Sequence, residues 1–440
     1  MSAFPGAPSD LLVGPEHGER SNAVRVALLS DVFAKNMGYL ENILPKYFAR
    51  HGVDVHVITM DLPPYYWVDG HQETYAGFAD RLQAGTVEVL DGYTLHVLSH
   101  TQIAGYMRMV GLREKLRSLR PHVVQTTTVI GWNALEAALC QPFLGYKLFT
   151  GSHTTASVFP LATRQLPWWN KSRVQCSLTR TFPGRLVSCF SEKCYAVTED
   201  CAQIASTFFG VPPQKVELMY LGVDTEYNYS VVSEAAAKER LSLRHALGFN
   251  EEDIVCIYTG KFTEEKKLFL LAESVKELRA RGEPFRALFV GNGPEGRMLQ
   301  KYSSSTIVGF MPFSKLGRYY RAADIGVWPG NESTSMLDAA ACGLPIVVSD
   351  KVVYRAPVNG NGITFKSDSI EDLIGVLMKL REPQIRQRFG SSGAIRMARD
   401  FSWQVLAMRR LRDYESVLGS NGFSNLKIGE DRFSHEPGSR

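Results

Sequence analysis

The chain has 440 residues, enough for two domains, and its 45% apolar and 21% charged residues are ordinary for a globular protein. A net charge of +4 is small for this length, so we expect no nucleic-acid partner, and no apolar run reaches the roughly 18 residues of a membrane-spanning helix. Seven cysteines, an odd number without zinc-ligand spacing, indicate reduced thiols, a cytoplasmic address and no metal site.

The first half of the chain alternates strand and helix patterns. Residues 1–22 are rich in Gly, Pro, Ser and Glu, lack the apolar segment of a signal peptide, and predict a disordered tail. The patterns after this tail predict strand 24–30, helix 40–51, strand 53–59, strand 95–98, helix 110–119, strand 123–126 and strand 147–152. Such alternation is typical of a parallel sheet covered by helices. Gly38 lies before the first helix, where a missing side chain lets a ligand approach the backbone.

Two features near the end of this half concern ligand binding. His153 follows strand 147–152, so we expect it at the carboxyl edge of the sheet, where an imidazole can donate a hydrogen bond to a hydroxyl or a phosphate. Residues 157–189 mix aromatic with basic side chains, Lys171 and Arg180 among them. This mixture fits contact with an anionic membrane surface or a phosphate-bearing acceptor, and it fits an irregular insertion packed on the domain equally well.

The second half repeats the alternation. Its patterns predict helix 234–247, strand 254–260, helix 268–281, strand 287–290, strand 307–310, helix 316–323, helix 370–380, helix 383–400 and helix 401–418, with a second disordered tail at 420–440. Gly260 ends strand 254–260, and Lys261 and Lys266 follow it. Two cations at the carboxyl end of a strand can neutralise a diphosphate.

The segment Asp324–Asp350 carries the strongest functional pattern. It predicts strand 325–328, a polar loop 330–335, helix 336–342 and strand 345–348. In an open α/β sheet such a loop lies where ligands bind, and the unpaired N–H groups around Ser335 and Met336 at the helix start suit a phosphate. Glu332 lies in the loop and Asp338 lies on the helix. A phosphate-binding helix start flanked by two carboxylates suits a ligand that has phosphates at one end and hydroxyl groups around it. A nucleotide sugar fits this description.

This segment resembles the donor-binding signature of the retaining glycosyltransferases of family four. Residues 337–348 (LDAAACGLPIVV) are similar to the family's Leu-Glu-Ala-Met-Ala-x-Gly-x-Pro-Val-Val, with Asp338 in place of the second Glu. Only five residues separate Glu332 from Asp338, and the family's Gly-Phe-Gly is missing between them. Residues 260–266 resemble the Gly-Arg-Leu-x-x-x-Lys motif, with Lys261 in place of its arginine.

The resemblance spans about residues 24–418 and implies a fold and a domain plan. The fold would be α/β, with two Rossmann-like doubly wound domains facing each other across a cleft (GT-B). The implied parts are an N-terminal acceptor-binding domain at 23–223, a C-terminal nucleotide-sugar-binding domain at 224–400, and a crossover helix at 401–419.

The same resemblance implies transfer of a sugar from a nucleoside-diphosphate sugar to a lipid or polysaccharide acceptor, with retention and without metal or another cofactor. Lys261 and Lys266 would neutralise the diphosphate, and Asp338 would hold the ribose. Glu332 and His153 would contact the transferred sugar from two sides. In relatives the base rests near the end of the strand that corresponds to 307–310, so Phe310 or Met311 would line that slot. Retention in the family needs no protein nucleophile.

Two other functions stay open from the sequence. A nucleotide-sugar epimerase or hydrolase on the same fold would need more acid–base side chains in the cleft than His153 alone provides. A non-catalytic nucleotide-sugar-binding protein would fit the altered loop around Glu332. A dehydrogenase is disfavoured because no G-x-G-x-x-G follows the first strand. The basic and aromatic stretch adds an expectation of peripheral membrane contact through the N-terminal domain.

Overall fold

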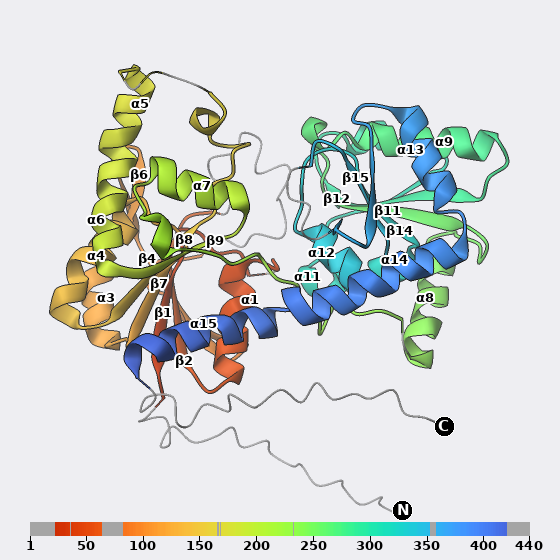
Figure 1. The fold of residues 1–440 in the computed structure, drawn as a ribbon. Coiled ribbons are helices and arrows are strands. Elements are labelled where there is room, and N and C mark those ends of the chain that lie inside the picture. Colours follow the sequence, from red (N-terminus) through yellow and green to blue (C-terminus); the bar gives the residue numbers. More distant parts are fainter. Residues whose placement is uncertain are drawn as a thin grey trace, which may run out of the picture.

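The structure is a computed structural model that describes residues 23–35, 37–63, 82–164, 167, 169–231, 233–352 and 358–419. Both tails that the sequence predicts, 1–22 and 420–440, lie outside these residues. The described chain forms two α/β domains side by side, connected by the linker after the N-terminal sheet and by the last helix (Figure 1). Among the described helices, none is long and apolar enough to span a lipid bilayer.

An eight-stranded sheet in the order β10-β9-β8-β7-β1-β2-β4-β3 forms the N-terminal domain. Its strands are β1 (Arg25–Leu29), β2 (Asp54–Met60), β3 (Val87–Leu90), β4 (Tyr93–Leu98), β7 (Val123–Thr126), β8 (Lys147–Ser152), β9 (Ser191–Ala196) and β10 (Val216–Leu218). Neighbouring strands are parallel except β3 with β4. Later strands lie on both sides of β1, so the direction of winding reverses there and opens a crevice at the carboxyl edge.

Helices and one hairpin surround this sheet. They are α1 (Leu40–Arg50), α3 (Leu112–Leu119), α4 (Trp132–Leu144), α5 (Lys171–Cys176), α6 (Phe182–Phe190), α7 (Glu199–Phe208) and the hairpin of β5 (His100–Ile103) with β6 (Tyr106–Met109). A π-helical turn, Ser177–Thr181, joins α5 to α6. The chain is therefore helical from residue 171 to 190, which contradicts the irregular form of the predicted insertion, whereas its packing on the domain is confirmed by buried Cys176 and Val187.

The C-terminal domain contains a six-stranded parallel sheet in the order β13-β12-β11-β14-β15-β16. Its strands are β11 (Ile254–Lys261), β12 (Phe285–Asn292), β13 (Ser305–Val308), β14 (Ile325–Trp328), β15 (Ile346–Ser349) and β16 (Gly362–Phe365). Its helices are α8 (Glu234–Ala246), α9 (Leu268–Ala280), α10 (Gly296–Leu299), α11 (Phe313–Ala322), α12 (Ser335–Ala341), α13 (Ile370–Lys379) and α14 (Pro383–Arg396). This order reverses between β11 and β14, as in dinucleotide-binding folds.

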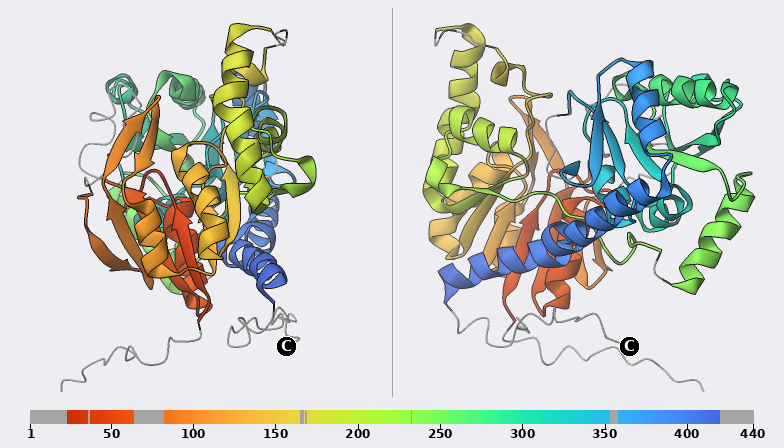
Figure 2. Two further views of the ribbon diagram at one scale, coloured as in Figure 1. Left: turned by 90° about the vertical axis from the view of Figure 1, so that its left-hand side faces the viewer. Right: turned by 45° about the vertical axis from the view of Figure 1, so that its right-hand side comes forward.

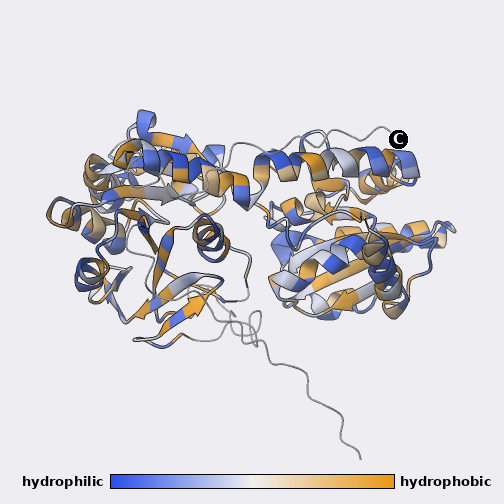
Figure 3. Cartoon of the chain, turned by 90° about the horizontal axis from the view of Figure 1, so that it is seen from below, coloured by the Kyte–Doolittle hydropathy of each residue, from blue (hydrophilic) through white to orange (hydrophobic). Residues whose placement is uncertain are grey.

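The two domains have separate apolar cores. The strands of the C-terminal sheet are buried almost throughout, because helices cover both faces of a parallel sheet. Figure 3 shows apolar colouring along strands of both domains and polar colouring on much of the outward helix surface. The layers and strand orders confirm the predicted class of two doubly wound α/β domains.

The last helix, α15 (Trp403–Leu418), returns from the C-terminal domain and packs on the N-terminal one (Figure 2). Trp403, Leu411 and Tyr414 are buried in the N-terminal core. Ser402 caps the helix, its Oγ accepting from the backbone N–H of Val405 at 3.4 Å. The chain thus crosses between domains twice, and both crossings meet where Val223 pairs with Ser402.

Candidate functional site

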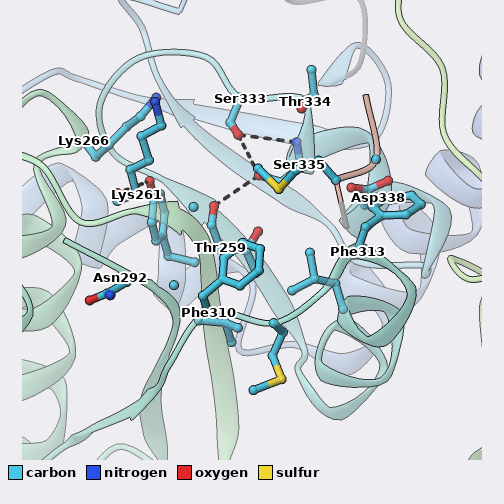
Figure 4. Close-up of a pocket in the computed structure, with 18 of the residues that line it drawn as sticks. Thr259, Lys261, Lys266, Asn292, Phe310, Phe313, Ser333, Thr334, Ser335 and Asp338 are labelled. Carbon is cyan, nitrogen blue, oxygen red and sulfur yellow. Dashed lines mark hydrogen bonds between the residues drawn. The ribbon is translucent and has the colours of Figure 1, made fainter. Parts of the chain in front are cut away.

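Seven of the predicted site residues line one pocket of about 290 Å³ between the two domains (Figure 4). The C-terminal domain contributes the ends of β11 and β12, the loop before α11 and the start of α12, while the N-terminal domain contributes the loop before α1. The seven are Gly38, Gly260, Lys261, Lys266, Phe310, Ser335 and Asp338. The pocket lies at the reversal between β11 and β14, the position where open α/β sheets bind ligands.

Hydrogen bonds hold the wall formed by the start of α12. Trp328 at the end of β14 is fully buried, and its Nε1–H lies 3.3 Å from the carbonyl oxygen of Thr259 and 3.1 Å from Ser335 Oγ. Ser335 Oγ donates to the same carbonyl at 3.2 Å, and Ser333 Oγ lies 2.7 Å from Ser335 Oγ. One buried indole therefore fixes the serines against the end of β11.

The helix starts one residue before the predicted start at Met336. α12 begins at Ser335 and has seven residues, and Thr334 at its N-cap makes no side-chain hydrogen bond there. Ser333 Oγ instead accepts from the Ser335 N–H at 3.4 Å. So short a helix has a weak dipole, and positive charge in the pocket must come mainly from side chains.

Two lysines supply this charge. Lys261 ends β11, and Lys266 ends the 3₁₀ turn Glu264–Lys266. Lys266 Nζ donates to the carbonyl oxygen of Glu332 at 3.2 Å and to the side-chain oxygen of Asn331. Burial lowers the pKa of both lysines, and Glu265 opposes this effect. Removing a cation from water without fully balancing its charge lowers its pKa, so an anionic ligand would stabilise both ammonium groups.

Asp338, in the first turn of α12, lies across the pocket from the two lysines (Figure 4) and is 8% exposed. It accepts a 3.0 Å hydrogen bond from Asn228 Nδ2, which lies in the linker between the domains. Burial raises the pKa of Asp338 well above its usual value, and the charge of Asp224 raises it further. The carboxyl group therefore holds its proton to a higher pH than a free aspartate, and it can exchange hydrogen bonds with a ligand hydroxyl.

The N-terminal domain reaches the pocket through Gly38. A side chain at this position would overlap the ring of Phe313, the first residue of α11. Phe313 in turn packs edge-on against Tyr227, with ring centroids 5.9 Å apart. The glycine thus lets the loop before α1 close directly against the C-terminal domain.

Three predicted site residues are not part of this lining. Met336 does not line the pocket, since its side chain is fully buried in the C-terminal core. Glu332 is half-buried and close enough to Lys266 and to Cys201 of the N-terminal domain to shift the pKa of both. Its carboxylate therefore lies beside the pocket, near the gap between domains.

His153 follows β8 and keeps part of its surface exposed to solvent, although protein atoms crowd the imidazole and exclude part of its water. The surrounding protein lowers its pKa, and the guanidinium of Arg410 on α15 lowers it further. The imidazole is therefore neutral at pH 7, and either ring nitrogen can carry the single proton.

Several lining residues were not anticipated from the sequence. They are Met37, Tyr39, Thr259, Asn292 and Phe313. Thr259 and Asn292 lie at or near the ends of predicted strands, so the rule that led to Lys261 could have found them. Nothing in the local sequence marks Phe313, whose position depends on the contact between domains. Within the described ranges, no three His, Cys, Asp or Glu side chains come together to hold a metal ion.

Two family models match the chain. Residues 44–227 match the family model described as Glycosyltransferase Family 4, and residues 253–382 match the one described as Glycosyl transferases group 1. The chain is 27% identical over 249 residues to the D-inositol 3-phosphate glycosyltransferase of Kribbella flavida, covering 52% of this chain and 57% of that protein. It is 29% identical over 157 residues to the alpha-monoglucosyldiacylglycerol synthase of Acholeplasma laidlawii, covering 33% and 39%. The chain thus spans about half the length of the curated relatives it matches.

Solved structures share the fold. Sucrose-phosphate synthase from Thermosynechococcus elongatus has a TM-score of 0.63 at 15% identity, covering 90% of this chain and 100% of that one. HepE from Anabaena in complex with UDP has a TM-score of 0.62 at 14% identity, covering 89% and 100%. The two domains therefore have the GT-B arrangement, and the two family matches together cover more than half of the sequence. The chain belongs to glycosyltransferase family four.

Proposed function

We propose that the protein is a retaining glycosyltransferase that moves a sugar from a nucleoside-diphosphate sugar to a lipid or glycan acceptor. The observation that carries this proposal is the convergence of Lys261, Lys266 and Asp338 on one pocket at the β11–β14 reversal. The Anabaena structure of the same fold is a complex with UDP. The relatives from Kribbella and Acholeplasma carry the names of a glycosyltransferase and a glycolipid synthase, which supports the same reaction class.

The donor would lie across the pocket. Its diphosphate would contact Lys261 and Lys266, its ribose would exchange hydrogen bonds with Asp338, and its base would rest against Phe310. The transferred sugar would then point toward Glu332 and His153, beside the gap between the domains. No metal or other cofactor is part of this proposal, because the two ammonium groups supply the positive charge.

The lysines would act most strongly on the leaving group. When the bond between the anomeric carbon and the diphosphate oxygen breaks, negative charge builds up on that oxygen, and fixed cations in a partly buried site stabilise it. The acceptor oxygen forms the new bond on the same face and passes its proton to the departing diphosphate. This route needs no nucleophile from the protein, and we assign no catalytic base.

The acceptor would bind from the N-terminal domain. His153 lies at the carboxyl edge of that sheet, and a neutral imidazole can accept or donate one hydrogen bond to a hydroxyl. We propose that the acceptor is a hydroxyl group of a lipid or a polysaccharide. We also propose that the protein is cytoplasmic and works at a membrane surface.

A non-catalytic nucleotide-sugar-binding protein is the second candidate, because Glu332 lies outside the lining of the pocket. A donor panel decides between them. We expect one nucleoside diphosphate to raise the melting temperature, since a ligand at about 100 times its Kd stabilises a protein by about 2.7 kcal/mol. Mass spectrometry with lipid and polysaccharide acceptors then detects transfer.

Glu332→Ala separates the remaining alternatives. The proposal expects this variant to bind the nucleotide normally but to transfer sugar slowly. A pure binding protein would show the melting shift without transfer in either form. An epimerase or hydrolase would consume the donor in the absence of any acceptor.

A further inference from the structure

The helical rod from Lys171 to Phe190, made of α5, the π turn and α6, lies in the most basic part of the N-terminal domain. No Asp or Glu occurs between Glu136 and Glu192, whereas six Lys and Arg residues do. The rod projects beyond the rest of its domain in two different views (Figures 1 and 2). A projecting element without acidic residues is suited to an anionic surface.

One side of the rod is packed against the domain. Cys176 and Val187 on this side are buried, and a side chain at Gly184 would overlap the carbonyl oxygen of Phe209. Arg180 also turns toward the protein, where its Nε donates to the Tyr106 hydroxyl at 3.0 Å. The inner side is therefore fixed, and the opposite side is left to the solvent.

The opposite side carries a row of large apolar side chains. Val174, Leu178 and Phe182 are 43%, 69% and 71% exposed, and Trp169 just before the rod is 66% exposed. Steps of four residues drift sideways on an α-helix with 3.6 residues per turn, and the wider π turn offsets this drift. The three side chains thus form one stripe, whereas exposed apolar residues on ordinary surfaces are scattered singly.

Exposed cations accompany the stripe. Lys171 lies three residues before Val174, and Arg185 lies three residues after Phe182. We define the docking face as Trp169, Lys171, Val174, Leu178, Phe182 and Arg185. Aromatic and aliphatic side chains between cations are the pattern of helices that lie in the interface of an anionic bilayer.

We propose that the docking face binds the surface of a bilayer that contains anionic phospholipids. The apolar stripe enters the boundary between head groups and acyl chains, while Lys171 and Arg185 contact phosphate groups. Charge complementarity favours this occupant over a second copy of the chain, because two such faces would bring like charges together. The inference names the surface behind the membrane contact proposed above and rests on that part of the proposed function, but it does not depend on the transfer reaction.

Sedimentation of the full chain with vesicles tests the proposal. One set of vesicles contains phosphatidylcholine alone, and the other contains added phosphatidylglycerol. Two double variants probe the stripe and the charges, Leu178→Glu with Phe182→Glu and Lys171→Glu with Arg185→Glu. Matched controls on the C-terminal domain are Ile395→Glu on α14, 66% exposed, and Lys379→Glu at the end of α13.

We expect the unaltered chain to bind the anionic vesicles and to bind phosphatidylcholine more weakly. The stripe variant should lose at least about tenfold in partitioning, since burying two large apolar side chains contributes more than one factor of ten. The charge variant should lose binding to anionic vesicles and its salt dependence, while both controls bind like the unaltered chain. The melting shift with UDP should be the same in all forms, which separates this test from that of the donor pocket.

Three outcomes would overturn the proposal. They are no binding to anionic vesicles, equal binding by the stripe variant, and equal losses in the controls. If the stripe variant changes only the oligomeric state in size-exclusion chromatography, the face belongs to contacts between copies of the chain, and the lipid assignment is likewise wrong.

Discussion

Lys46 of α1 and Asp224 of the interdomain linker form a 2.7 Å salt bridge in which the side chains are 3% and 0% exposed. The Tyr47 hydroxyl donates to the same carboxylate at 2.8 Å. Four residues further on, Asn228 Nδ2 lies 3.3 Å from the Asp224 carbonyl oxygen and 3.0 Å from Asp338 Oδ1. A helix of the N-terminal domain is thereby connected through the linker to an acid of the proposed donor pocket.

Removing Lys46 should therefore affect both stability and nucleotide binding. In Lys46→Met the charge of Asp224 stays buried without its partner, which costs about 3–5 kcal/mol. We expect a clearly lower melting temperature and a smaller shift with UDP, because the linker that positions Asn228 relaxes. Lys35→Met is the control, since its salt bridge with Glu88 is partly exposed and such pairs contribute only about 0–1 kcal/mol. Equal effects of the two variants would contradict the structural role of the buried pair.

The lysines of the pocket should determine turnover. Lys266→Ala and Lys261→Ala should each lower kcat/KM by about 10²–10³-fold, as is typical when a group that stabilises developing negative charge is removed. Lys266→Arg should keep part of the rate. Because burial lowers the pKa of both lysines, UDP affinity should fall as alkaline pH removes their protons. Lys276→Ala, on the exposed side of α9, should change none of these values, and losses there as large as at Lys266 would refute the assignment.

The parts of the fold that could be predicted from the sequence are those that local burial determines. Strands of a covered parallel sheet are continuous apolar runs, so the predicted strand 325–328 has the bounds observed for β14. The position of Lys261 at the pocket followed from the rule about carboxyl ends of strands. Edge elements gave no such signal. β3 lies at the edge of the sheet, where Val87 and Val89 are 60% and 72% exposed. Its sequence therefore has no continuous apolar run, and the strand was missed.

The missed parts of the site depend on contacts between distant residues. Asn228 reaches Asp338 across 110 positions of sequence, and Gly38 meets Phe313 from the other domain. No local pattern encodes either pair, because both depend on how the domains face each other. The rod at 171–190 was obscured for a different reason, since Pro183, Gly184 and the π turn interrupt the 3.6-residue period.

Closure of the loop before α1 should require a glycine at position 38. In Gly38→Ala the new methyl group meets the Phe313 ring, which Tyr227 holds from another side, and overpacking of this kind costs about 1–3 kcal/mol. We expect weaker UDP binding with little change in the fold, and recovery in the double variant Gly38→Ala with Phe313→Leu. Gly375→Ala on α13 has open space around it and serves as the control. If the two alanine variants bind UDP alike, the loop does not close on Phe313.

Asp338 should leave a signature in the pH dependence of stability. Burial raises its pKa above the usual value of 3.8 in the folded protein. As the pH rises from about 4, the unfolded chain releases this proton before the folded protein does, so the unfolded state gains relative stability. In Asp338→Asn the group cannot ionise, and it can still accept the hydrogen bond from Asn228. We therefore expect the melting temperature of the variant, relative to the unaltered chain, to rise as the pH increases above about 4.

Nucleotide binding gives the second half of this test. If Asp338 meets the ribose as a neutral carboxyl group, a carboxamide of the same shape should preserve most of the UDP affinity at pH 7. Asp338→Ala should weaken binding by about tenfold, the effect of one lost hydrogen bond of about 1.4 kcal/mol. Glu252→Gln, in the exposed turn before β11, should leave both the pH profile and the affinity unchanged. A melting difference that stays flat with pH, combined with equal losses for Asn and Ala, would mean that Asp338 binds the ribose as a carboxylate.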